Sequence, residues 1–286
     1  MIKISKKSFF VCLLLLLLFY ALFFCVLFEK NYKTKHGYSF FFGKRPLISV
    51  LVTSYNYGHY LRQTLDSILA QTYKKYEVII VDDGSTDNSV ELIKEYTQRY
   101  PNFHLYQHEG GVNKGLPASV KFGVEKAKGE YVAFLESDDH WHKAKLEKVA
   151  EMINKHPNAV IISNNVTAFA EDTKIVWLAK SYINSINKNI SEENFIESDS
   201  LFNTIPTLSA VTIKTSNLVN LDFNPPISVF LDLWIYNQIF AKYPLYYLFD
   251  KLTYWRKHPD SFGYRAHEFN EQNDDFIKKL KEITKK

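Results

Sequence analysis

The sequence predicts an α/β fold with a mainly parallel sheet and helices on both faces. Short apolar runs rich in β-branched and aromatic residues alternate, in the first half of the chain, with segments of helical periodicity. Three of these runs lead directly into a polar or acidic cluster. Strands that alternate with helices form βαβ units, and such sheets bind ligands at the carboxyl ends of their strands. The polar clusters are therefore expected to meet at one edge.

Four apolar runs have the length and composition of buried strands. They are Leu47–Thr53, Tyr76–Val81, Phe103–Gln107 and Tyr131–Leu135. A helix is predicted between the first two, where Leu61, Leu65, Ile68 and Leu69 recur at spacings of three and four. A second helix is predicted over Val90–Tyr100, which Pro101 ends.

The second half of the chain gives weaker signals. Residues 180–200 are polar and rich in Asn, Ser and Glu, which indicates a loop near the site. An apolar run follows over Thr204–Ile213, then a predicted helix over Asp232–Phe240 and an apolar segment over Tyr246–Tyr254. A polar helix is expected over 266–286.

Composition narrows the classes of function. The chain has 286 residues, 46% of them hydrophobic, and a formal net charge of +4. The lysine excess lies mainly near the two ends, so no broad basic face is predicted, which argues against nucleic acid as a partner. Both cysteines, Cys12 and Cys25, lie in one apolar run, so a metal site elsewhere would use oxygen or imidazole ligands.

That apolar run predicts a single N-terminal transmembrane helix. Residues 9–28 carry no charge and are long enough to span a bilayer core of roughly 30 Å. Residues 1–8 form a basic tail, and residues 29–46 a connector. A cleaved signal peptide is the alternative, but the run lacks a small-residue cleavage pattern. With one such helix, the protein would be a single-pass membrane protein. The distribution of flanking lysines slightly favours a cytosolic location for the C-terminal body.

The ordered motifs resemble a known family. They are Thr53-Ser54-Tyr55-Asn56, the segment from Ser67 to Thr72, Asp82-Asp83-Gly84-Ser85, and the segment from Gly129 to Asp139. In this order they are similar to the family 2 inverting glycosyltransferases of the GT-A (Rossmann-like) fold. The resemblance implies one GT-A domain over 47–286, with a nucleotide-binding half at 47–140 and an acceptor-binding half at 141–265.

The first two polar clusters are expected to bind the nucleotide. By resemblance, one carboxylate of Asp82 and Asp83 contacts the base, and Asp83 is the better candidate. Thr53, Ser54, Tyr55 and Asn56 would line the base and ribose pocket. Taken alone, the segment starting at Asp82 is also typical of a turn that caps the next helix, or of a receiver-domain acidic pocket.

The third cluster, Glu136-Ser137-Asp138-Asp139, is a candidate metal site. Carboxylates this close raise one another's pKa unless a cation binds, and oxygen ligands suit Mg²⁺ or Mn²⁺. The family usually has Asp at position 136, so we assign the metal to Asp138 and Asp139. A helix-capping cluster before Trp141 is the alternative.

Three further site residues are implied by the resemblance. Asp232 corresponds to the family's general base, although Leu231 replaces the usual preceding acid, and an acid favoured by the helix dipole is the alternative. Arg256 and His258 belong to a segment similar to the family's Tyr-Arg-x-His-x-x-Ser, which folds over the donor. Arg256 would bind diphosphate, and His258 phosphate or metal. Surface positions are the alternative.

The sequence therefore predicts a metal-dependent inverting glycosyltransferase. It would move a sugar from a nucleotide-diphosphate donor, with UDP as the expected carrier, to an acceptor hydroxyl of a surface glycan or glycolipid. A non-catalytic nucleotide-sugar-binding membrane protein of the same fold is the alternative, because positions 120, 136 and 231 depart from the family pattern.

Overall fold

The computed structural model describes residues 44–170, 205, 207–225, 231–240 and 242–261. Within these ranges, no helix is long and apolar enough to cross a membrane. Several predicted elements lie outside the described residues. They are the basic tail at 1–8, the anchor at 9–28, all but the end of the connector, the loop at 180–200 and the C-terminal helix at 266–286.

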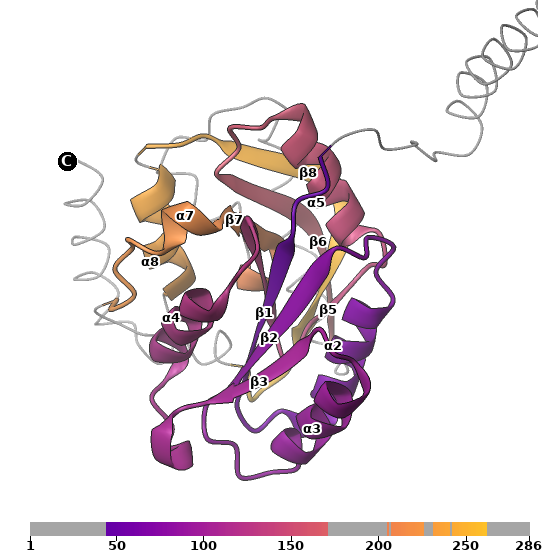
Figure 1. The fold of residues 1–286 in the computed structure, drawn as a ribbon, viewed down its shortest axis with the longest axis vertical. Helices are drawn as coiled ribbons and strands as arrows, with labels where there is room; N and C mark the ends of the chain where they lie inside the picture. Colours follow the sequence, from indigo (N-terminus) through magenta and orange to yellow (C-terminus); the bar gives the residue numbers. More distant parts are fainter. Residues whose placement is uncertain (1–43, 171–204, 206, 226–230, 241, 262–286) are drawn as a thin grey trace, which may run out of the picture. The chain divides into compact units, whose positions relative to one another are not determined.

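The described strands form one mixed eight-stranded sheet in the order β3-β2-β1-β4-β7-β6-β8-β5 (Figure 1). Their bounds are β1 Ile48–Ser54, β2 Tyr76–Asp82, β3 Phe103–Gln107, β4 Tyr131–Glu136, β5 His140–Trp141, β6 Ile161–Ala170, β7 Val211–Lys214 and β8 Leu245–Lys257. The strands β3, β2, β1 and β4 are parallel, as predicted. The strand β7 runs antiparallel to β4 and β6, β8 is parallel to β6, and β5 is antiparallel to β8.

Helices cover both faces of this sheet, which confirms the predicted α/β class (Figure 1). The helices are α2 Gly58–Leu69, α3 Ser89–Arg99, α4 Leu116–Lys126, α5 Lys145–Lys155, α7 Thr215–Leu218 and α8 Leu231–Phe240. Side chains of a strand alternate between faces. In β1, Val50 and Val52 pack in the core under α2, α3 and α5, whereas Leu51 packs in the core under α4, α7 and α8.

The four parallel strands follow the sequence prediction, whereas β6, α4 and α5 are among the elements that it did not include. The strand β6 contains Ser163, Asn164 and Asn165, which interrupt its apolar pattern although all three are buried. The helix α4 contains Gly123, and a Cβ there would come within about 2.1 Å of the Leu51 side chain. The helix α5 begins only at Lys145, after β5, so the acidic cluster does not cap it.

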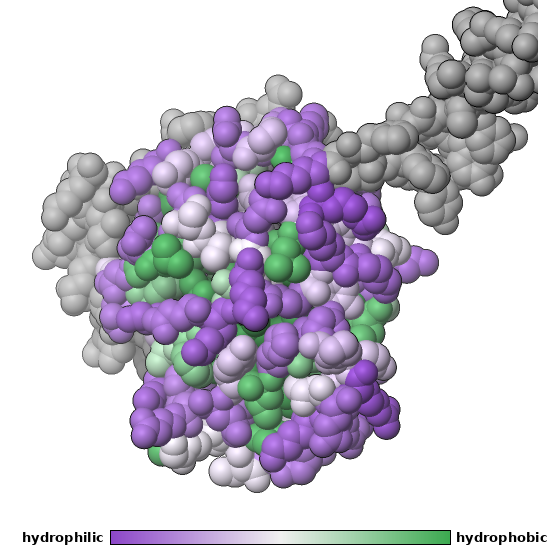
Figure 2. Space-filling model, viewed as in Figure 1, coloured by the Kyte–Doolittle hydropathy of each residue, from purple (hydrophilic) through white to green (hydrophobic). Residues whose placement is uncertain are grey.

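Figure 2 shows the face of the molecule seen in Figure 1. Hydrophilic side chains cover most of this face, and the hydrophobic ones lie in small patches between them. The larger apolar side chains are instead inside, in the two clusters that flank the sheet. Packing on both sides holds the carboxyl ends of β1, β2 and β4 in register, with Thr53 paired to Val81 and to Glu136.

Candidate active site

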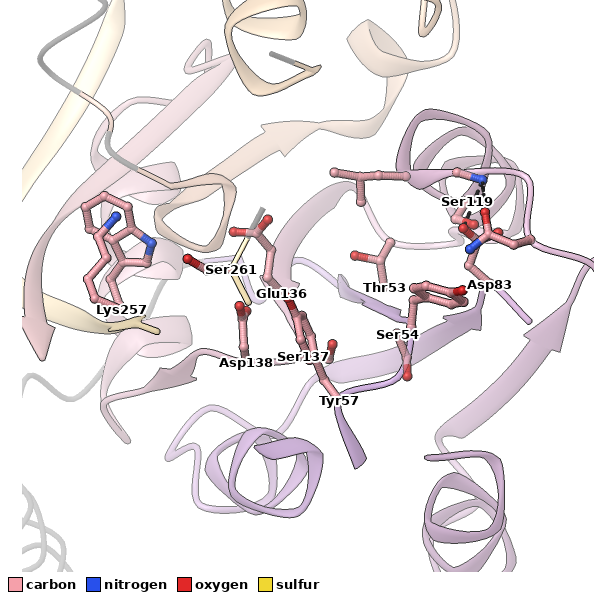
Figure 3. Close-up of a pocket in the computed structure, with 15 residues that line it drawn as sticks. Thr53, Ser54, Tyr57, Asp83, Ser119, Glu136, Ser137, Asp138, Lys257 and Ser261 are labelled. Carbon is pink, nitrogen blue, oxygen red and sulfur yellow. Dashed lines mark hydrogen bonds between the residues drawn. The ribbon is translucent and has the colours of Figure 1, made fainter. Parts of the chain in front are cut away.

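A cavity of about 350 Å³ opens at the carboxyl ends of β1, β2 and β4. The predicted polar clusters contribute Thr53, Ser54 and Tyr55, then Asp83, then the segment from Glu136 to Asp138. In Figure 3 these groups lie in a row, with Asp83 and Ser119 at one end, Glu136 and Asp138 in the middle, and Lys257 at the other end. The structure thus brings the three clusters together at one edge, as predicted.

Asp83 is fixed in place by the loop that precedes α4. Its two carboxylate oxygens accept hydrogen bonds from the backbone N–H groups of Lys114, at 2.8 Å, and Gly115, at 2.9 Å. Nε2 of His108 lies 3.4 Å from Oδ1 of Asp83 and 2.9 Å from the Ser119 hydroxyl. A carboxylate has about four acceptor positions, so Asp83 keeps capacity to accept an N–H from a ligand.

Gly84 allows this loop to approach the end of β2. Its φ is +80°, and a Cβ there would lie 2.7 Å from the carbonyl oxygen of Gly111 and 2.8 Å from the backbone nitrogen of Asn113. Both the backbone conformation and the contact therefore exclude larger residues. This close approach places Asn113 and Gly115 in the cavity wall beside Asp83.

Asp82 and Asn56, both predicted to bind the nucleotide, do not line the cavity. Asp82 is fully buried and accepts hydrogen bonds from the backbone and hydroxyl of Ser85 at 3.0 and 2.6 Å, as the turn alternative predicted. Asn56 has a φ of +54°, and its side-chain oxygen accepts from the backbone N–H of Thr86 at 2.7 Å. Thr53, Ser54, Tyr55 and Asp83 line the cavity, whereas Asp82 and Asn56 hydrogen-bond to the loop that follows β2.

The structure places only one of the two predicted metal ligands, Asp138, in the cavity wall, whereas Asp139 is buried behind it. The backbone N–H of Asp139 donates to the carbonyl of Glu136 at 3.1 Å, which closes a turn and directs the Asp139 side chain inward. That side chain is 1% exposed and accepts a hydrogen bond from the backbone N–H of Arg256 at 2.8 Å. Glu136, which was not assigned to the metal from the sequence, lines the cavity together with Asp138.

The segment Glu136–Asp139, here called the acidic turn, brings several carboxylates close enough to affect one another's pKa. Burial, reinforced by the nearby charge of Asp138, raises the pKa of Asp139 to about 8. Burial and the charges of Asp138 and Asp139 also raise the pKa of Glu136 well above its usual value. The Thr207 hydroxyl lies 2.8 Å from Glu136 and 3.2 Å from Asp139, but its single hydrogen can serve only one of them. A cation near Glu136 and Asp138 would relieve this repulsion.

The residues at the end of β8, which were predicted to fold over the donor, make hydrogen bonds to the acidic turn. Nε2 of His258 lies 3.1 Å from Oδ2 of Asp138, so His258 contacts a cavity residue without lining the cavity itself. Arg256 does not line the cavity either: its Nε donates to the Asp138 carbonyl at 2.9 Å and its Nη2 to Gln63 at 2.5 Å. Because side chains alternate along a strand, Lys257 faces the cavity in its place.

Asp232 is near the acidic turn but is not among the cavity-lining residues. It lies in the first turn of α8, and the backbone N–H of Leu233 donates to its Oδ1 at 2.7 Å. Burial raises the pKa of Asp232 to about 6, and its charge raises the pKa of Glu136 further. A carboxylate with this pKa is mostly ionised at neutral pH and is able to accept a proton.

The side chains present fit a metal that a substrate helps to bind. Within the described residues, no group of three or more His, Cys, Asp and Glu side chains is arranged to hold a metal ion. Mg²⁺ is commonly bound by only one or two carboxylates, with substrate phosphates and water completing its ligands. The carboxylates of Glu136 and Asp138 face the cavity and supply such a partial set.

Comparison with known proteins identifies the family. The model of the family described as "Glycosyl transferase family 2" matches residues 49–212, more than half of the chain. The chain belongs to glycosyl transferase family 2. The matched segment begins in β1, contains Asp83 and the whole acidic turn, and ends in β7.

Relatives within family 2 match parts of the chain. "Putative teichuronic acid biosynthesis glycosyltransferase TuaG" of Bacillus subtilis is 40% identical over 109 residues, 38% of this chain and 42% of TuaG. "Glycosyltransferase GlyA" of Streptococcus pneumoniae is 35% identical over 158 residues, 54% of this chain and 22% of GlyA. The chain thus spans less than half the length of each of these relatives.

Solved structures share the fold. S. aureus TarS 1–349, solved in complex with UDP-GlcNAc, has a TM-score of 0.60 at 21% identity, and the match covers 75% of this chain and 60% of that one. The mannosyltransferase PcManGT from Pyrobaculum calidifontis, solved with GDP-Man and Mn²⁺, has a TM-score of 0.55 at 17% identity, covering 80% and 61%. At these identities the similarity shows the GT-A fold.

Several cavity residues were not predicted from the sequence. They are Tyr57, Asn113, Gly115, Leu116, Ser119, Trp255, Lys257 and Ser261. Alternation along β8 would have indicated Lys257 and Trp255, because it places them on the side opposite Arg256. The loop residues were not predictable in this way, because their position depends on the contact between Gly84 and Gly111.

Proposed function

We propose that this family 2 protein is an inverting glycosyltransferase that uses a nucleotide-diphosphate sugar and a divalent cation, Mg²⁺ or Mn²⁺. The observation that carries the proposal is the row formed by Asp83, then Glu136 with Asp138, in one cavity. Asp83 would meet the base of such a donor, and Glu136 with Asp138 would meet its diphosphate. The alternative is a non-catalytic protein of the same fold that binds nucleotide sugars, and measuring nucleotide release distinguishes the two.

Asp83 would select the base of the donor. Its carboxylate is an acceptor held toward the cavity by Lys114 and Gly115, so it favours a base that presents a ring N–H, such as uracil. The exposed ring of Tyr55 offers a surface on which a base can stack. The structures of TarS with UDP and UDP-GlcNAc support UDP as the carrier. Guanine also presents a ring N–H, so GDP donors belong in the test.

Asp138 and Glu136 would hold the cation, with His258 orienting Asp138 through their 3.1 Å contact. When bound, the cation neutralises charge on the departing diphosphate. Transfer forms a bond between the acceptor oxygen and the anomeric carbon, and breaks the bond from that carbon to the diphosphate. The hydroxyl proton would go to Asp232, whose raised pKa suits a general base.

The acceptor would be a hydroxyl of a surface glycan or glycolipid. The relative named for teichuronic acid biosynthesis supports a surface polysaccharide. We further propose that residues 9–28 anchor the protein in a membrane with its body in the cytosol, where nucleotide sugars are available. These residues form an uninterrupted apolar run between lysine-containing flanks.

The decisive experiment measures nucleotide release by the purified full-length protein across UDP- and GDP-sugars, with Mn²⁺, with Mg²⁺ and with a chelator. We expect cation-dependent release that Asp138→Asn and Asp232→Asn both abolish. Donor binding without release in any combination would instead support the non-catalytic alternative. Release that the chelator leaves unchanged would overturn the cation requirement.

A further inference from the structure

Lys257 is a cavity cation that lies within the field of the carboxylates at 136, 138 and 139 but forms no direct ion pair with a described residue. It lies at the end of β8, it is half-buried, and its Nζ is over the ring of Trp255. No hydrogen bond or ion pair from Nζ to a described residue is found. Burial lowers the pKa of Lys257 to about 8, so the ammonium remains mostly charged at neutral pH.

The other cations around the acidic turn are already engaged. Arg256 donates to the Asp138 carbonyl and to Gln63. Lys145 is fully buried and donates to Asn164, the carbonyl of Ser209 and Thr253, at 2.7, 2.7 and 3.2 Å. The hydrogen bonds of these two residues are thus made to other parts of the protein. Lys257 is therefore the cation of this group that is free to contact a substrate.

The position of Lys257 in the row indicates which part of a substrate it meets. In Figure 3, Asp83 and Lys257 lie on opposite sides of Glu136 and Asp138. Under the proposed function, on which this step rests, the base is at Asp83 and the diphosphate is at the acidic turn. The transferred sugar and the acceptor then lie toward Lys257 and Trp255, whose ring offers a flat apolar face for a sugar.

We infer that Lys257 binds an anionic group, a carboxylate or a phosphate, carried by the transferred sugar or by the acceptor. A half-buried ammonium forms strong charge-assisted hydrogen bonds with such a group and discriminates against a neutral analogue. The substrate class is thus an acidic saccharide, supplied by a reaction that oxidises a sugar to a uronate or adds a phosphate.

The experiment compares substrates with and without one anionic group at the same position, using the full-length protein, Lys257→Gln and the control Lys251→Gln. Lys251 is an exposed lysine on the same strand, so its replacement tests for a general effect of lost charge. The donor arm measures binding of UDP, UDP-glucose and UDP-glucuronate by calorimetry. The acceptor arm measures UDP release with monosaccharide glycosides that do or do not carry a 6-phosphate or a uronate carboxylate.

We expect the native protein to prefer the anionic member in one arm, and Lys257→Gln to reduce that preference about tenfold or more. A preference seen in the donor arm would mean that the transferred sugar carries the anionic group. A preference seen in the acceptor arm would mean that the acceptor carries it. Binding of UDP itself and use of the neutral member should change less than about threefold. Lys257→Arg, which keeps the charge, should retain most of the preference.

Two results would overturn the inference. One is a native protein without preference for the anionic member in either arm. The other is a Lys257→Gln variant that binds UDP itself more weakly, because Lys257 would then contact the donor diphosphate. Failure of the native protein to bind any UDP-sugar would be a different outcome, since it would overturn the proposed function as well.

Discussion

Nε of Arg256 donates a hydrogen bond to the carbonyl oxygen of Asp138 at 2.9 Å. The guanidinium therefore stabilises the backbone of the acidic turn without lining the cavity. The Arg256 backbone N–H also donates to Oδ1 of Asp139. The guanidinium lies over the ring of Tyr60, with its Cζ 4.3 Å from the centroid. These contacts connect β8 to the acidic turn and leave Asp138 facing the cavity while Asp139 is buried.

Asp138 and Asp139 should therefore respond differently to mutation. Asp138→Asn should lower cation-dependent turnover about a hundredfold or more, because the cation would lose a charged ligand. Measured kcat at saturating Mn²⁺ tests this. Asp250→Asn, on an exposed part of β8, is the matched control and should keep native activity. Equal turnover by Asp138→Asn and native protein would remove Asp138 from the cation site.

Asp139→Asn should make the protein relatively more stable as pH rises. The folded state raises the pKa of Asp139 to about 8, so it keeps a proton that the unfolded chain loses above about pH 4. This contribution to stability is complete below pH 4 and is lost as pH rises through 8, by at most about 1.4 kcal/mol per pH unit. Asparagine does not titrate in this range.

The measurement for Asp139 is the free energy of unfolding in urea from pH 5 to 9, with a chelator present. The difference between Asp139→Asn and native protein should grow toward high pH. Asp250→Asn, which is exposed, should show a constant difference. Parallel curves for Asp139→Asn would show that Asp139 is already ionised in the folded protein at pH 5.

Asp83→Asn should weaken nucleotide binding about tenfold or more, since a charged acceptor is lost and the new amide group faces one of two backbone N–H donors. Calorimetry with UDP measures this. Asp82→Asn is the informative comparison, because Asp82 contacts Ser85 rather than the cavity. It should lower thermal stability while the folded protein keeps its UDP affinity. A reversed pattern would make Asp82 the base contact.

Gly84→Ala should damage the nucleotide end of the cavity. An added Cβ would meet the backbone of Gly111 and Asn113 below 3.0 Å, in addition to the strain of a positive φ. We expect a loss of about 1 to 3 kcal/mol in stability and weaker UDP binding. Gly111→Ala is the matched control: its φ is also positive, at +63°, but an added Cβ would meet nothing within 4 Å. Equal UDP affinity in the two variants would contradict the contact argument.

Lys145→Met should destabilise the fold without changing the cavity wall. Methionine fills a similar volume but leaves the acceptors on Asn164, Ser209 and Thr253 without their donor. The expected cost is about 3 kcal/mol or more, measured from denaturant midpoints. Lys148→Met, on the exposed side of the same helix, should change stability by less than about 0.5 kcal/mol. Similar losses in both variants would contradict a structural role for Lys145.

The sequence by itself determined the parallel half of the sheet and the place of the site. Local patterns suffice there, because β1, β2, β3 and β4 are apolar runs that alternate with amphipathic helices. The rule that ligands bind at the carboxyl ends of such strands then placed Asp83 and Asp138 at one edge. The strand β6 was not predictable in this way, since its buried asparagines depend on partners distant in sequence, in β8 and at Lys145, as well as on the backbone of β6 itself.

Only the tertiary structure decided which polar residues of each cluster face the cavity. Asp82 and Asp83 are adjacent acids, as are Asp138 and Asp139, yet only Asp83 and Asp138 line the cavity. That choice depends on partners distant in sequence, such as Arg256 for Asp139 and the loop at Lys114 for Asp83. A local motif gives the type of side chain available, whereas long-range hydrogen bonds fix its direction.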